Sequence, residues 1–238
     1  MARQTNLKLV GRFGNLRFYK RYDDYYVKSI PKNIKQSKAT KACSGSFGKS
    51  NTLARILRQL LLPVLADKNI MDKRNKLHLP LYQWLLTDSL KNTSPQNDAP
   101  LITGYEFNSK SAFLQRFKKP LSIERLTGGN LGLIIPSLNP VKDIIAPTGT
   151  QSVQLFIASG SCNPGKNTTV AGYSTSIIYT YSDTIVPEQN ILLPIAAVVS
   201  NLTVTSAALR YTAKRKNGEM VTMERRWMPA AIIGAMYN

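Results

Sequence analysis

The stretch Cys43–Ser50, CSGSFGKS, comes closest in this chain to a chemical motif. It ends Gly48-Lys49-Ser50, like the phosphate-binding loop of nucleotide hydrolases, in which backbone N–H groups and a lysine surround the phosphates. The first glycine of that motif would fall at position 43, which is a cysteine, and a polar, lysine-rich segment precedes it where a buried strand is required. We therefore interpret the stretch as a turn and helix cap, at which Lys49 can receive a nucleic-acid phosphate without hydrolysis.

Other residues that carry catalysis or bind metals are few and scattered. His78, the one histidine, lies between two predicted helices, where we expect it to be solvated or to cap a helix. Cys43 and Cys162 lack the paired spacing of zinc ligands, so we expect two idle thiols, with one disulfide as the alternative. The 13 acidic residues form no cluster that indicates acid–base catalysis or a magnesium site. The sequence predicts a protein that is not an enzyme and uses neither a metal nor another cofactor.

Positive charge is the strongest signal, and it is concentrated in the first third of the chain. The net charge is +19, and residues 1–78 hold 18 basic and 4 acidic residues against 14 and 9 in residues 79–238. Such a field selects nucleic acid or another polyanion as a partner. Aromatic residues alternate with the cations, which suits base stacking as well as phosphate contacts, although the rings can instead pack into the core. The candidate polyanion-binding residues are Arg12, Arg17, Lys20, Arg21, Lys28, Lys32, Lys35, Lys38, Lys41, Lys49, Arg55, Arg58, Lys214, Arg215 and Lys216.

The elements that position the first of these cations are a hairpin and a linker. Residues 15–22 and 25–30 are rich in β-formers and flank the turn signal Asp23-Asp24, which predicts two antiparallel strands. Alternation then places Leu16 and Phe18 on one face and Arg17 on the other. The next segment has lysine at every third position and too little apolar content to pack, so we expect an extended basic arm.

Two helices follow. Ser50 or Asn51 is the expected cap of the first, and Pro63 should kink it near its end. The second is predicted over residues 79–91, with Pro80 in its first turn. The first helix is predicted from an apolar stripe at helical spacing, formed by Leu53, Ile56, Leu57, Leu60, Leu61, Val64 and Leu65.

The chain changes character after the polar linker 92–100. Short β-prone runs separated by turns predict an antiparallel β-sandwich, and Asn217-Gly218 favours a tight hairpin with the basic trio 214–216 at its tip. We therefore expect an α+β protein with a basic hairpin, arm and helices in residues 1–99 and a β-sandwich-like domain in residues 100–238. The expected strands are 101–107, 121–126, 131–135, 152–158, 171–181, 191–200, 203–213, 219–226 and 230–237.

The N-terminal pattern also resembles a known family. Gly11-Arg12-Phe13-Gly14-Asn15, followed by the return strand 26–32, is similar to the opening of a family of uncharacterised Bacteroidota proteins. The similarity continues through the Leu62-Pro63 step and the helix end at 90–92 into the β region. It implies a bacterial or phage-associated origin and this architecture, without catalytic residues.

The function expected from these observations is structural. No secretory signal is recognisable at the N-terminus and no apolar run approaches the length of a membrane span, so we expect a cytoplasmic protein or a component of an assembled particle. The first hypothesis is a phage- or virion-like subunit that binds copies of itself and holds nucleic acid or neighbouring subunits on its basic surface. The alternative is a small nucleic-acid-binding protein that does not self-assemble.

Overall fold

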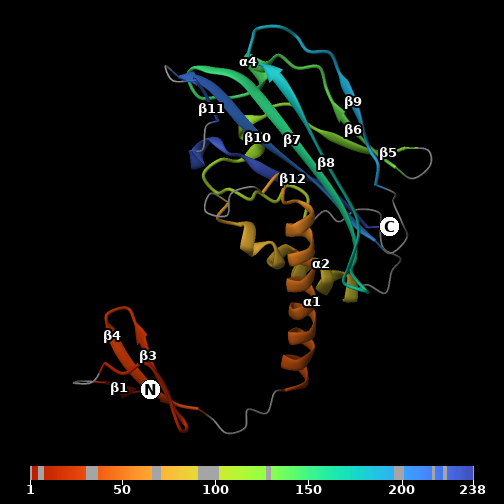
Figure 1. Ribbon diagram of the computed structural model, residues 1–238. Coiled ribbons are helices and arrows are strands. Elements are labelled where there is room, and N and C mark those ends of the chain that lie inside the picture. Colours follow the sequence, from red (N-terminus) through yellow and green to blue (C-terminus); the bar gives the residue numbers. More distant parts are fainter. Residues whose placement is uncertain are drawn as a thin grey trace. The chain divides into compact units, whose positions relative to one another are not determined.

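The computed structural model divides the chain into two compact units, Met1–Ser44 and Gly45–Asn238 (Figure 1). The sequence suggested segments 1–99 and 100–238; the helices instead share a core with the C-terminal strands. The described residues are 2–4, 8–30, 37–65, 71–90, 102–126, 130–195, 201–215, 218–221 and 224–237.

The N-terminal unit is a four-stranded antiparallel sheet in the order β1-β4-β3-β2. It contains the predicted hairpin as β3 and β4, joined by Tyr22-Asp23, and adds two short strands. β2 turns into β3 at Gly14, whose φ of +56° is a conformation that glycine adopts without strain. The strands are β1 (Ala2–Arg3), β2 (Gly11–Phe13), β3 (Leu16–Arg21) and β4 (Asp24–Ser29).

The first long helix begins earlier than the sequence predicted. α1 spans Lys38–Leu60, so the expected cap at Ser50 or Asn51 is wrong. Ser37 caps the helix instead, because its Oγ accepts a hydrogen bond of 3.1 Å from the backbone N–H of Thr40.

The expected extended arm is therefore helical from Lys38 onward. Its low apolar content excludes a packed core but not a helix, because Ser37 caps the first turn and the ring of Phe47 contacts His78 and Tyr82 of the second helix. Lys32 and Lys35 lie outside the described residues.

Pro63 ends the helix rather than kinking it. α1 stops at Leu60, because proline lacks the N–H that a helix needs and disfavours helical geometry in the residue before it. A turn follows in which the backbone N–H groups of Val64 and Leu65 both donate to Leu61, so the end of the apolar stripe still reaches the core.

The remaining helices are shorter. α2 (His78–Leu90) confirms the second predicted helix, with Pro80 in its first turn. The others are η1 (Arg74–Lys76), α3 (Phe113–Arg116), α4 (Pro140–Asp143) and η2 (Arg225–Trp227).

Two antiparallel sheets form the β part of the larger unit. In the five-stranded sheet the central strand β10 pairs with β7 on one side and with β11 and β12 on the other, and β8 lies outside β7 (Figure 1). The three-stranded sheet has the order β5-β6-β9. The strands are β5 (Ser122–Arg125), β6 (Leu131–Ile135), β7 (Thr150–Asn163), β8 (Thr168–Thr180), β9 (Gln189–Leu193), β10 (Leu202–Arg215), β11 (Gly218–Val221) and β12 (Ala230–Tyr237).

Three predicted strands differ from the structure. In the run 191–200, strand β9 ends at Leu193, and residues 196–200 lie outside the described residues. Residues 102–104 form a turn in which Gly104 has a φ of +81°, and only one bridge, Glu106 to Ala231, follows. The run 219–226 ends as a strand at Val221, and η2 begins at Arg225.

Strand β10 separates two hydrophobic cores. Its even-numbered residues Val204 and Ala208 face a core shared with α1 and α2, and its odd-numbered Leu209 and Tyr211 face a core shared with the three-stranded sheet. This is the alternation expected for a strand buried on both faces. The predicted α+β class and the paired antiparallel sheets are confirmed.

A pair of glycines lets α1 approach the large sheet. Gly160 of β7 and Gly172 of β8 are direct cross-strand partners, and Leu60 lies against both. A Cβ atom at Gly160 would lie 2.6 Å from the Cβ of Leu60, and one at Gly172 would lie 2.9 Å from its Cδ2. The helix can therefore pack at this distance only over residues without side chains.

Candidate nucleic-acid interface

Strand register brings three predicted cations into one row across the N-terminal sheet. Arg12 of β2 lies opposite Arg17 of β3, which in turn lies opposite Lys28 of β4. Directly paired residues project to the same face, with Cβ atoms about 5 Å apart. All three side chains are exposed, and among the described residues none of them has an acidic partner. We call these three residues the basic row.

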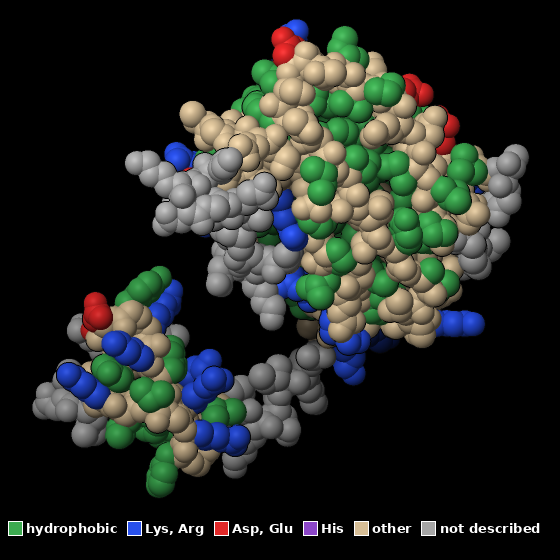
Figure 2. All heavy atoms as spheres, turned by 45° about the horizontal axis from the view of Figure 1, so that its top comes forward, with side chains coloured by type: hydrophobic (Ala, Val, Ile, Leu, Met, Phe, Trp, Pro, Cys, Tyr) green, Lys and Arg blue, Asp and Glu red, His purple; other side chains and the backbone are tan. Residues whose placement is uncertain are grey.

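The basic row weakens the sheet that carries it. Like charges directly opposite each other on neighbouring strands repel and destabilise the pairing. The Arg12 Nε donates to the carbonyl of Gly14 at 3.2 Å, which holds the side chain without neutralising it. Figure 2 shows Lys and Arg side chains over much of the visible face of this unit. The arrangement therefore favours an anionic partner rather than stability.

Two tyrosines lie next to the basic row on the same face. Tyr19 and Tyr26 are cross-strand partners whose rings stack with centroids 5.9 Å apart. The Nζ of Lys28 lies 5.7 Å from the Tyr19 ring, a cation–π contact. Both tyrosines are half-buried, so these rings pack against each other and support the row.

The opposite face of the sheet is apolar. Phe18 lies opposite Val27, and Phe13, which is 79% exposed, lies opposite Leu16. Lys20 also belongs to this face, where its Nζ lies 5.8 Å from the ring of its cross-strand partner Tyr25. The structure thus separates Lys20 from the basic row, which the sequence alone did not distinguish.

The β3–β4 turn presents an exposed aromatic side chain, Tyr22, which is not among the polyanion-binding residues predicted from the sequence. Tyr22 is 84% exposed and has a φ of +55°, a strained conformation for a bulky residue. The guanidinium of Arg21 lies 5.7 Å from its ring. A bulky residue in a two-residue turn was the available signal, because such turns favour glycine or asparagine.

The other predicted cations lie elsewhere. Lys38, Lys41, Lys49 and Arg55 are exposed along α1, at positions outside the apolar stripe. Arg58 is half-buried, and its pKa is lowered by that burial and by the charge of Arg74.

The basic trio lies at the end of β10. Lys214 and Arg215 pair with Glu219 and Gly218 of β11, as expected of a hairpin, and Lys216 lies outside the described residues. Of the predicted polyanion-binding residues, the structure therefore brings Arg12, Arg17 and Lys28 together in the basic row.

The phosphate-loop interpretation and the turn interpretation of Cys43–Ser50 both fail. The whole stretch lies within α1, where backbone N–H groups are bonded along the helix and cannot surround a phosphate. Ser50 is buried, and its hydroxyl donates to the carbonyl of Phe47.

The histidine and the cysteines form no shared site. His78 lies at the start of α2, with its Nδ1 3.0 Å from the carbonyl oxygen of Asn75. Both thiols are free: Cys43 is exposed, whereas burial raises the pKa of Cys162 to about 12. Within the described ranges, no three His, Cys, Asp or Glu residues form a group that could hold a metal ion.

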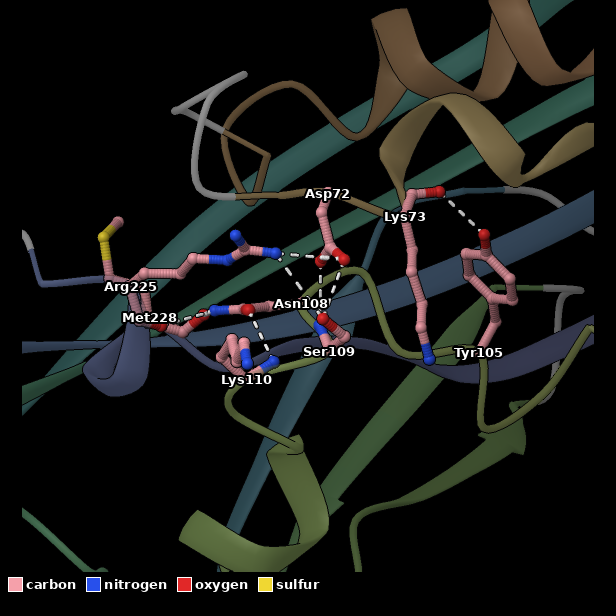
Figure 3. A network of polar contacts seen from close by, with 8 residues as sticks. All are labelled: Asp72, Lys73, Tyr105, Asn108, Ser109, Lys110, Arg225 and Met228. Carbon is pink, nitrogen blue, oxygen red and sulfur yellow. Dashed lines mark hydrogen bonds and ion pairs between the residues drawn. The ribbon is translucent and has the colours of Figure 1, made fainter.

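A polar network around Asp72 connects three separate segments of the larger unit (Figure 3). The Asp72 carboxylate accepts hydrogen bonds from the backbone N–H and the hydroxyl of Ser109, at 2.9 and 2.7 Å, and lies 3.0 Å from the guanidinium of Arg225. The Asn108 side chain donates to the carbonyls of Arg225 and Met228. The hydrogen bonds of this network join loops to one another, although the buried Nε of Arg225 has no partner among the described residues, so we assign the network to stability.

Replacing Asp72 with asparagine is expected to lower the free energy of unfolding by about 1 kcal/mol at pH 7. The bonds from Ser109 and the charge of Arg225 hold the pKa of Asp72 below its usual range. A lowered pKa stabilises the fold above the unfolded value of about 4. The contribution decreases as the pH falls below that value and is lost as the pH falls through the folded-state pKa. Urea unfolding at pH 7 and pH 2.5 measures the effect. An equal difference between the two proteins at both pH values would contradict it.

One small cavity lies beside β12. It has a volume of about 140 Å³ and is lined mainly by apolar side chains, including Phe113, Leu121 and Ile232. Glu106 is at its wall and accepts hydrogen bonds from the N–H of Phe113, although burial raises the pKa of this carboxyl group. The carboxylate is therefore engaged in holding the start of α3.

None of the helices in the described part of the chain is long and apolar enough to cross a membrane. No family model, curated protein or solved structure matches this chain. The resemblance to the Bacteroidota proteins stays a prediction from sequence, and the basic row is the arrangement from which a function can be argued.

Proposed function

We propose that this protein binds nucleic acid through its phosphate backbone, using the face of the N-terminal sheet that carries Arg12, Arg17 and Lys28. The observation that supports this is the basic row, three exposed cations held side by side although their repulsion weakens the sheet. Neighbouring strands are about 4.8 Å apart, so the row spans about 10 Å and can contact several phosphate oxygens at once.

The surroundings of the row indicate which nucleic acid it prefers. Tyr19 and Tyr26 are half-buried and contact each other, so they offer little free surface to bases. Tyr22 is exposed at the turn beside Arg21 and can stack on an unpaired base. We therefore expect binding with weak sequence preference and a preference for single strands over duplexes.

Titration of a fluorescent single-stranded oligonucleotide with the full chain tests this function. We expect the logarithm of the affinity to fall linearly with the logarithm of the salt concentration, because each phosphate contact releases counterions. A matching duplex should bind more weakly. Failure to bind either oligonucleotide at 0.05 M salt would overturn the proposal.

Replacing Tyr22 with glycine is expected to separate stability from binding. Glycine relieves a positive φ that costs an L-residue about 1 kcal/mol, so the hairpin amides should exchange with solvent more slowly. Loss of one stacked base should reduce single-strand affinity about tenfold. Duplex binding, which leaves no base free to stack, is the control and should hardly change. Unaltered single-strand affinity would exclude Tyr22 from the interface.

A subunit of a larger particle, of phage or virion type, is the second candidate. Its support is the apolar face of the same sheet, where Phe13 is 79% exposed and none of the described side chains from 8 to 30 is fully buried. Uncovered apolar surface of this kind favours contact with another protein surface. Particles that persist after nuclease treatment and in 1 M salt would support this function, and a uniform small species would exclude it.

A further inference from the structure

Strand β8 forms a long, uncharged edge of the five-stranded sheet. It spans thirteen residues, Thr168–Thr180, and contains neither a charged residue nor a proline. One side pairs with β7, and no other described strand pairs with its outer side. Its residues are exposed or half-exposed except Tyr179, and Ile178 is 67% exposed. Such an edge presents unpaired backbone groups to any strand that can reach it.

The other edges in the described part of the two sheets are short, charged or covered. β5 carries Glu124 and Arg125, and β11 is only four residues long and carries Glu219. β9 has five residues and is flanked by the segment Pro187-Glu188 and by Pro194. These are the usual protections against edge-to-edge pairing, and β8 lacks the corresponding charges and prolines.

The outer side of β12 is covered by the chain itself. Gly104 and Phe107 donate backbone hydrogen bonds to Ile232 and Ala230, and Ile232 donates to Tyr105. β8 is therefore the only long edge, among the described strands of these sheets, without such a cover.

The part of β8 able to accept a new strand can be delimited. Between the pairs Ser161–Ala171 and Cys162–Thr169 the register shifts, which leaves Val170 as the extra residue of a bulge. The bulge disturbs the start of the strand, because an extra residue interrupts the ladder. Residues 171–179 then form an uninterrupted run centred on Thr175.

We propose that β8 pairs with β8 of a second copy of this chain, antiparallel and with the two-fold axis at Thr175. Two copies of one strand in this arrangement are self-complementary, as a closed dimer requires. The pairing joins the two large sheets into one continuous sheet of ten strands, and its main-chain hydrogen bonds provide the affinity.

The side chains fit this register. Tyr173 of one copy lies opposite Ile177 of the other, an aromatic and β-branched pair that stabilises antiparallel strands. Because the strand carries no charge, the paired segments of the two copies do not repel each other.

A cysteine cross-link tests the register in the full chain with Cys43→Ser, so that the buried Cys162 is the remaining native thiol. At the two-fold axis the paired Cα atoms are about 5 Å apart, within the range for a disulfide. Thr175→Cys should therefore give a covalent dimer on mild oxidation. Thr180→Cys, about 33 Å from its counterpart, should not. Cross-linking of neither or of both to the same extent would overturn the register.

Light scattering after size-exclusion chromatography tests the dimer itself. Nuclease-treated protein in 0.5 M salt should have twice the mass of one 26.5 kDa chain, so that bridging by nucleic acid does not contribute. Ser174→Lys with Ser176→Lys places lysines opposite each other and should give monomers. Gln151→Lys with Asn190→Lys adds equal charge at exposed positions outside β8 and should leave the dimer intact.

Any other result overturns the proposal that β8 pairs with β8 of a second copy. A monomeric wild-type chain at 0.1 mM would do so, as would a dimer that the β8 lysines do not affect. A species larger than the monomer that forms only with another protein would assign the edge to that partner instead. Neither measurement depends on nucleic acid, so the dimer and the proposed function can fail separately.

Discussion

Replacing Arg12, Arg17 and Lys28 together with glutamine is expected to weaken single-strand binding at least about tenfold at 0.15 M salt, without loss of stability. Each lost phosphate contact reduces the slope of log affinity against log salt by about 0.7, so three should reduce it by about 2. The thermal midpoint should stay constant or rise, because the substitutions remove like charges from directly opposed positions.

A triple substitution elsewhere distinguishes this local effect from a general loss of charge. Lys110, Lys118 and Lys166 are exposed in the larger unit, and their replacement with glutamine changes the net charge equally. We expect this variant to keep nearly the wild-type salt slope. Equal loss of affinity in the two variants would show that binding follows the net charge and that the basic row has no special role.

Replacing Gly160 with alanine is expected to lower the free energy of unfolding by about 2 kcal/mol. The added Cβ would lie 2.6 Å from the Cβ of Leu60, an atom fixed to the backbone of α1 that cannot rotate away. The helix must therefore move off the sheet, and the core between Leu57 and Val204 loses contact area.

Gly48→Ala is the matched control for this substitution. Gly48 is exposed in the same helix, and a Cβ atom added there would meet no other atom within 4 Å, so alanine should stabilise the protein by about 0.5–1 kcal/mol. Urea unfolding of both variants measures the two opposite shifts. A neutral Gly160→Ala would mean that α1 does not rest on this glycine pair.

Helices and strands that follow from a local pattern of residues were predictable from the sequence. The stripe from Leu53 to Leu65 marks a core-facing helix because apolar residues recur every three to four positions. The run 131–135 and the run 230–237 match β6 and β12 for a similar reason, since β-prone residues bounded by turns favour strands.

The secondary-structure predictions were wrong where an element depends on a helix cap or on contacts with another part of the chain. The sequence predicts the start of α1 near Ser50, which is too late, because the polar turns before Ser50 are held by the Ser37 cap and by the contacts of Phe47 with α2 rather than by an apolar stripe. The run 101–107 is expected to be a strand from its apolar residues, yet it follows β12 irregularly after the turn at Gly104. Apolar content alone does not distinguish a regular strand from an irregular segment that lies alongside one.

The candidate nucleic-acid interface was likewise only partly predictable from the sequence. The sequence by itself determined that the protein is strongly basic and that the excess charge lies near its N-terminus, because charge is a sum over residues and needs no fold. Only the tertiary structure decided that Arg12, Arg17 and Lys28 share one row while Lys20 lies on the other face. Adjacency across strands depends on register, and a shift of one residue would move every side chain to the opposite face. These strands are neighbours in the chain, and the two-residue turns Gly14-Asn15 and Tyr22-Asp23 set their register, so a turn at the expected Asp23-Asp24 would give a different set of pairs.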